Sequence, residues 1–109
     1  MNRAADQFAI LIRELTPADG VSLGQGRRGF GSGTLMVDGH IFAMVQGERI
    51  VLKLPAPRVA ELIASGRGHP FGAGKSRPLR EWVALDQANA DWRRIADEAL
   101  AFGRAGRPR

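Results

Sequence analysis

The spacing of apolar positions predicts three amphipathic helices. Between residues 3 and 15, Phe8, Leu11, Ile12 and Leu15 follow the i, i+3, i+4, i+7 pattern of one helical face. A second helix is expected after Pro55, because proline is tolerated in a first turn. A third is expected before the C-terminus. The apolar stripes of these two helices consist of Val59, Leu62 and Ile63, and of Trp92, Ile95, Ala96, Ala99 and Phe102.

Between the first two helices, residues 21–54 predict an antiparallel meander. Asp38-Gly39 lies between two apolar runs and is typical of a two-residue hairpin, which pairs Val37 with His40, Met36 with Ile41 and Leu35 with Phe42. A second turn is expected at Gly47-Glu48. The glycines within residues 24–33 predict an irregular opening of the meander, and residues 81–85 predict a short edge strand after a loop at 67–78.

Both faces of this meander are predicted to be apolar. With turns at 38–39 and 47–48, one face carries Met36, Ile41, Ala43, Val45, Ile50, Leu52 and Leu54. The other carries Leu35, Val37, Phe42, Met44 and Val51, with His40 and Lys53 towards its margins. A sheet face in water should be polar at alternate positions. We therefore expect helices on one side, and a further helix or a second subunit against the face of Leu35 to Val51, which makes those five residues a candidate interface.

The elements predict a single α+β domain, a curved antiparallel meander with helices packed on it, in the order α-β-β-β-β-α-β-α. Residues 1–103 form this domain and residues 104–109 a flexible basic tail. The 109 residues, 44% of them apolar, can form one core. The chain has no cysteine, which excludes disulfides, thiolate metal sites and thiol nucleophiles.

No apolar run approaches the length of about 20 residues that a membrane-spanning helix needs. The N-terminus also lacks the features of a signal peptide. These features predict a soluble, cytoplasmic protein that does not engage membranes.

The formal net charge of +5 is unevenly distributed. Residues 67–80 and 103–109 hold seven of the 16 cationic residues and no acidic one, which leaves nine cations against 11 acids elsewhere. Nucleic-acid backbones and other polyanions bind such basic segments. The candidate polyanion-binding residues are Arg27, Arg28, Arg67, Lys75, Arg77 and Arg80. Phe71 and Trp82 flank the basic loop and either stack on bases or anchor the loop to the core.

Motifs for catalysis or cofactor binding are incomplete. Residues 24–29 match the dinucleotide-binding pattern G-x-G-x-x-G, but a β-hairpin follows where that site needs a helix. Gly74-Lys75-Ser76 resembles the end of a phosphate-binding loop, but His69 stands at the position of its first glycine. His40 and His69 lack neighbouring catalytic or ligating partners in the sequence. We therefore predict no catalytic residues, no cofactor and no metal site.

Several short motifs occur in an order that resembles a known family. After the N-terminal helix come Arg28-Gly29-Phe30-Gly31, the run from Leu35 to Val45, Leu52-Lys53-Leu54, His69-Pro70-Phe71, Glu81-Trp82-Val83 and a closing helix with Trp92. In this order they are similar to the N-terminal domain of the TfoX/Sxy family. The segments 41–45 and 82–83 are also similar to MmcQ/YjbR-like proteins. Family members usually have methionine where this chain has Gly29.

The resemblance implies a helix packed on a curved antiparallel sheet, a frequent homodimer and no established catalytic residue. Full-length TfoX/Sxy proteins regulate natural competence in bacteria, which implies a role in competence or transcription regulation. MmcQ/YjbR-like proteins imply DNA binding. We therefore expect a non-enzymatic interaction module that binds a second copy or a protein partner. The alternatives are direct nucleic-acid binding through residues 67–80 and, third, a small enzyme.

Overall fold

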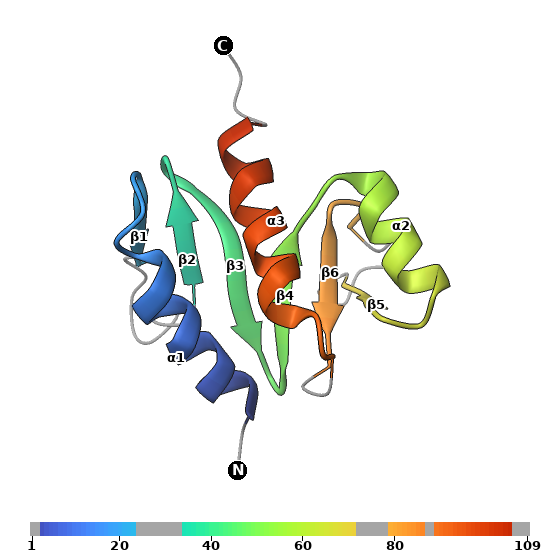
Figure 1. Cartoon of the computed structure of the whole chain (residues 1–109). Coiled ribbons are helices and arrows are strands. Elements are labelled where there is room, and N and C mark those ends of the chain that lie inside the picture. Colours follow the sequence, from blue (N-terminus) through green and yellow to red (C-terminus); the bar gives the residue numbers. More distant parts are fainter. Residues whose placement is uncertain (1–2, 24–33, 72–78, 87–88, 106–109) are drawn as a thin grey trace.

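The computed structural model describes residues 3–23, 34–71, 79–86 and 89–105, which form a sheet with helices packed on one of its faces (Figure 1). Its elements are α1 (Arg3–Leu15), β1 (Val21–Leu23), β2 (Thr34–Val37), β3 (His40–Gln46), β4 (Arg49–Lys53), α2 (Ala56–Ala64), β5 (His69–Pro70), β6 (Trp82–Leu85) and α3 (Trp92–Ala105). The predicted α+β class and order of elements are confirmed, and the two-residue strand β5 is an addition. The predicted irregular segment at 24–33 lies outside the described residues.

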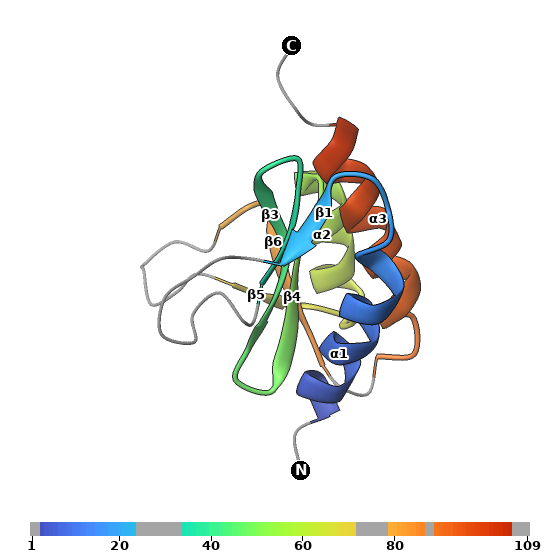
Figure 2. The same ribbon diagram turned by 90° about the vertical axis from the view of Figure 1, so that its left-hand side faces the viewer.

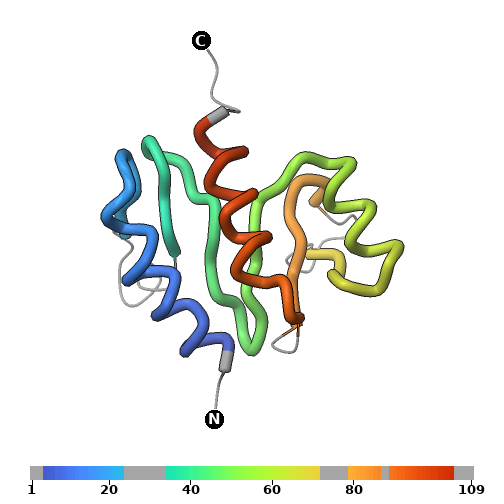
Figure 3. Tube along the Cα trace, in the orientation of Figure 1, coloured from blue at the N-terminus to red at the C-terminus, as the bar shows by residue number. Residues whose placement is uncertain are grey.

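The strands follow one another across a six-stranded antiparallel sheet in the order β1-β2-β3-β4-β6-β5. Figure 3 shows the chain advancing from β1 to β4 and then passing through α2 to the far edge. The prediction that β6 is an edge strand is wrong. Within the described sheet it lies between β4 and β5, because His69 and Pro70 pair with Ala84 and Val83.

The two predicted turns have the expected glycine geometry. Asp38 and Gly39 both have positive φ, 53° and 86°, as a type I′ hairpin requires. This turn pairs Val37 with His40 and Met36 with Ile41, as predicted. Between β3 and β4, Gly47 has a φ of 60° and the predicted two-residue turn is confirmed.

One extra residue in β3 changes the predicted register. Leu35 pairs with Ala43 and not with Phe42, because a β-bulge separates this pair from the one between Met36 and Ile41. Before and after the bulge, the β3 side chains therefore alternate between the two faces of the sheet in opposite phase. Leu35 therefore shares a face with Ala43, whereas Met36 and Ile41 share the opposite face with Met44.

The helices all pack on the face that contains Leu35, as the view along the sheet shows (Figure 2). Leu35, Ala43, Leu52 and Val83 form a continuous row across β2, β3, β4 and β6, and all four are completely buried. The candidate interface is therefore corrected. Leu35, Val37 and Phe42 belong to the helix-covered core, and only Met44 and Val51 lie on the opposite face.

The helices are also joined to one another and to the loops. Arg58 of α2 forms a two-pronged ion pair with Glu98 of α3, with its Nε 2.8 Å from Oε1 and its Nη2 3.0 Å from Oε2. The hydrogen bond to Glu98 raises the pKa of Arg58 above its ordinary value, so this guanidinium remains charged. Arg104 donates from Nη2 to the carbonyl of Asp19 at 2.7 Å. It belongs to α3, which ends at Ala105, so the helix includes the first two residues of the segment 104–109 that was predicted to be a tail.

Candidate functional site

The outer face of the sheet, opposite the helices, is the candidate site. Its residues follow from strand alternation and pairing: Ser22, Thr34, Met36, Ile41, Met44, Gln46, Arg49, Val51, Lys53, His69, Trp82, Ala84 and Asp86. No helix from the described part of the chain packs on this face (Figure 2). An antiparallel sheet with one solvated face normally carries polar side chains there. The middle of this face is apolar instead.

Burial divides these apolar residues into two groups. Val51 and Ala84 are 0% and 4% exposed, although neither belongs to the core cluster beneath the helices. Met36, Ile41 and Met44 form an apolar strip beside them, in which both methionines are partly exposed and Ile41 is 38% exposed. The chain therefore buries the centre of the outer face by itself and leaves the apolar strip in contact with solvent.

An aromatic pair lies at one end of the outer face. The ring centroids of Phe71 and Trp82 are 6.5 Å apart and the rings are tilted by 54°. Lys53, which pairs with Trp82 across β4 and β6, holds its ammonium group 5.9 Å from the centroid of the Trp82 ring. This is the range of a cation–π interaction. Both Trp82 and Phe71 are partly exposed. Phe71 and Trp82 therefore contact each other, and both keep aromatic surface accessible to solvent.

Polar side chains meet at the opposite end of β4 and β6. His69 donates from Nε2 to Asp86 Oδ2 at 2.9 Å, and Arg49 donates from Nε to Asp86 Oδ1 at 3.1 Å. The hydrogen bond from His69, together with the charge of Arg49, lowers the pKa of Asp86 below its ordinary value. Asp86 therefore ties β5 to β4 as an ionised carboxylate.

This His69–Asp86 pair was not found from the sequence. Asp86 follows a predicted strand, and only the pairing of His69 with Ala84 brings the two side chains together. A carboxylate-oriented imidazole can act as a general base when a nucleophile lies within hydrogen-bonding distance. In the described residues, Asp86 is the one side chain that hydrogen-bonds to His69. His40 lies exposed next to the hairpin turn, at the far end of the sheet from this pair.

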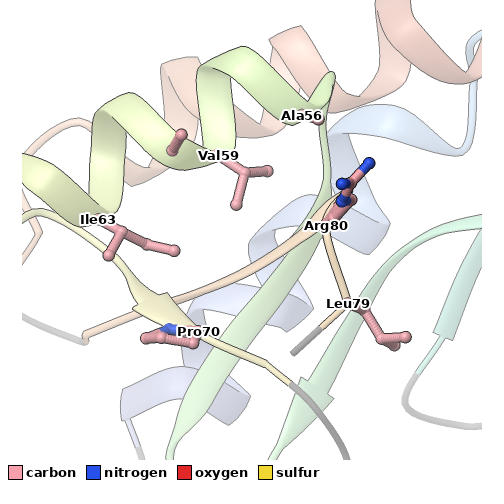
Figure 4. Close-up of a pocket in the computed structure, with 7 residues that line it drawn as sticks. Ala56, Val59, Ile63, Pro70, Leu79 and Arg80 are labelled. Carbon is pink, nitrogen blue, oxygen red and sulfur yellow. The ribbon is translucent and has the colours of Figure 1, made fainter. Parts of the chain in front are cut away.

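The predicted polyanion-binding residues are not gathered into one site. Arg27, Arg28, Lys75 and Arg77 lie outside the described residues. Arg67 follows α2, where its Nε donates to Ser65 Oγ at 3.0 Å and its Nη1 lies 3.8 Å from Asp91 Oδ2. Arg80 lies near the start of α2, where it lines an apolar hollow together with Ala56 (Figure 4). The nine-residue helix α2 therefore separates these two arginines.

The remaining features concern metal binding and membrane crossing. In the parts of the chain that the structure describes, no group of three or more histidine, cysteine or acidic side chains is arranged to hold a metal ion. None of the helices within those parts has the length and apolar character needed to cross a membrane.

Comparisons with known proteins were made on the sequence and on the fold. No protein-family model matches the chain, and neither a curated protein nor a solved structure was found that is similar to it.

Proposed function

We propose that this chain is a non-enzymatic interaction module that forms a homodimer through the outer face of its sheet. The observation that carries the proposal is the apolar strip of Met36, Ile41 and Met44, which lies on the face without helices. Methionine side chains adapt to irregular surfaces and are enriched at interfaces. A two-fold dimer would place the strip of one copy against the strip of the other, because such an interface uses the same surface twice.

Two further observations support this proposal. Val51 and Ala84 are already buried beside the strip, so a partner need cover only a limited apolar area. The imidazole of His69 is engaged by a carboxylate and meets no hydroxyl among the described residues, which favours binding over catalysis. A role in competence or transcription regulation rests on the resemblance to the TfoX/Sxy N-terminal domain alone.

The size of the face predicts a weak, reversible dimer. Six strands spaced about 4.8 Å apart, each about four residues long on average at 3.3 Å per residue, give a footprint of roughly 400 Å². A stable interface buries about 800 Å² on each partner. We therefore expect association in the micromolar to near-millimolar range, with the net charge of +5 opposing it at low salt.

Sedimentation equilibrium of the Ile41→Glu variant tests the dimer. Ile41 is exposed in one copy, so a glutamate there leaves the core intact but would be desolvated between two copies. We expect the wild-type chain to dimerise more strongly as salt is raised, and Ile41→Glu to weaken dimerisation at least tenfold. Ala101→Glu introduces the same charge on an exposed position of α3 and should leave the dimer unchanged. A wild-type chain that stays monomeric at near-millimolar concentration would refute the proposal.

A second candidate function is binding of single-stranded nucleic acid, and the aromatic pair favours it. Phe71 and Trp82 offer aromatic surface on the outer face, with the cations of Lys53 and Arg49 on the same side of the sheet. Single-stranded nucleic acids bind where bases can stack on aromatic rings beside positive charge. Each stacked base contributes about 1–3 kcal/mol.

Fluorescence anisotropy with a labelled oligothymidylate tests this second function. We expect Trp82→Ala to weaken binding by about tenfold, through the loss of one stacked base, and Lys53→Gln to reduce its salt dependence. Arg13→Gln removes an exposed arginine from α1, on the other side of the molecule, and serves as the matched control. Binding that is unaffected by Trp82→Ala would exclude this mode. Salt also distinguishes the two functions, because higher salt should weaken nucleic-acid binding but strengthen dimerisation.

A further inference from the structure

A hollow of about 560 Å³ lies between α2 and the chain segments that follow it (Figure 4). It is lined by Ala56, Val59, Ala60, Ile63, Pro70, Leu79 and Arg80. Figure 4 shows Val59 and Ile63 extending from α2 towards the wall formed by Pro70 and Leu79. Sites for small molecules commonly enclose about 300–1,000 Å³ and are mostly apolar with few polar groups. This hollow has that size and that character.

The hollow is separate from the outer face. Pro70 pairs with Val83, and Val83 is part of the row that lies beneath the helices. The hollow therefore opens on the α2 side of the sheet, at the edge formed by β5. A ligand could therefore occupy the hollow whether or not a partner covers the outer face, and its binding is independent of the proposed dimer.

Among the described residues that line this hollow, Arg80 is the one that carries a charge. Its side chain lies at the end of the hollow near Ala56 (Figure 4). Within the described chain, no carboxylate or carbonyl is hydrogen-bonded or ion-paired to Arg80, whereas Arg58, Arg67, Arg93 and Arg94 all have such partners. An arginine beside an apolar hollow complements a ligand with an anionic head and an apolar body. A guanidinium is also well matched to a carboxylate, because it can donate two parallel hydrogen bonds.

We infer that this hollow binds a small aliphatic monocarboxylate, with its hydrocarbon chain along Val59 and Ile63 and its carboxylate at Arg80. The apolar walls favour the hydrocarbon chain by removing methylene groups from water, and the guanidinium of Arg80, which has no partner among the described residues, selects the ionised head. The wide mouth and the single charged contact limit the affinity. For a ligand of about ten non-hydrogen atoms we expect a dissociation constant on the order of 0.1–1 mM.

Octanoate titrated into the ¹⁵N-labelled chain tests the inference by nuclear magnetic resonance. The amides of Ala60, Ile63 and Leu79 should shift and saturate. Octan-1-ol has the same apolar body without the charge, so it should bind more weakly at the same amides. Arg80→Gln should raise the dissociation constant of octanoate at least tenfold and change that of octanol less than twofold, because the substitution removes only the charge-assisted contact.

Two further variants make the test decisive. Ala60→Phe places an aromatic ring in the hollow from an exposed position of α2, so it should weaken the binding of both octanoate and octanol. Arg13→Gln removes an exposed charge from α1 and should leave the affinities for octanoate and octanol unchanged. The inference is overturned if Arg80→Gln, with its amide spectrum still dispersed, binds octanoate as tightly as the wild type. It is equally overturned if octanoate causes no saturable shift at α2.

Discussion

Replacing Phe42 with alanine should lower the free energy of unfolding by about 3–5 kcal/mol. Phe42 is 1% exposed and belongs to the core cluster beneath the helices, because the bulge in β3 turns it towards α3. Alanine would leave a cavity that the surrounding strands cannot fill by themselves. Since a domain of this size is stable by only about 5–15 kcal/mol, the variant should unfold at much lower urea concentration. Circular dichroism during urea titration measures this loss.

Met44→Ala is the matched control for Phe42→Ala. Met44 lies two residues further along the same strand but on the outer face, where it is partly exposed. Its loss should cost less, about 1–2 kcal/mol, because the Met44 side chain already contacts solvent in one copy and its removal leaves no closed cavity. Equal costs for the two variants would contradict the assignment of Phe42 and Met44 to opposite faces.

Local periodicity and turn chemistry were sufficient to predict the helices, the hairpins and the order of elements. Asp38-Gly39 and Gly47-Glu48 specify their turns through backbone conformations that involve only neighbouring residues. The bulge between the Leu35 and Met36 pairs could not be predicted in this way. It adds one residue to β3 without a glycine or proline to mark it, and it places Phe42 in the core cluster together with Ala43. One unmarked residue was enough to assign three core side chains to the wrong face.

The candidate sites required contacts between distant parts of the chain. The pairing of His69 with Ala84 brings His69 to Asp86, and α2 with the segment from Leu79 to Arg80 encloses the apolar hollow. Hydrophobic spacing carries no information about such contacts, because it describes one element at a time. By contrast, the position of Lys53 on the outer face was predicted, since it depends only on alternation within β4.

The absence of a side chain at Gly68 allows the chain after α2 to pass close to the sheet. A Cβ atom at this position would lie 2.5 Å from Cγ2 of Val83 and 3.3 Å from Cβ of Leu62. Both neighbours are completely buried in the core, so neither can move away freely. The residue also lies outside any helix, so alanine would gain no helix propensity there. Close packing, and not a turn, therefore requires glycine at position 68.

Gly68→Ala should accordingly lower the free energy of unfolding by about 2–3 kcal/mol, through overpacking against Val83. Val83→Ala alone should also lower the free energy of unfolding. In the double variant, however, the loss should be smaller than the sum of the two single losses by about 1 kcal/mol or more, because the new methyl group fills the space that Val83 vacates. Urea unfolding of the four proteins in this cycle measures the coupling. Gly66→Ala is the control. Gly66 has a φ of 79° and no atom within 4 Å of the position that a Cβ would take, so the cost of this substitution is conformational and Val83→Ala should not relieve it. Strictly additive losses for Gly68→Ala and Val83→Ala would show that this close approach does not constrain position 68.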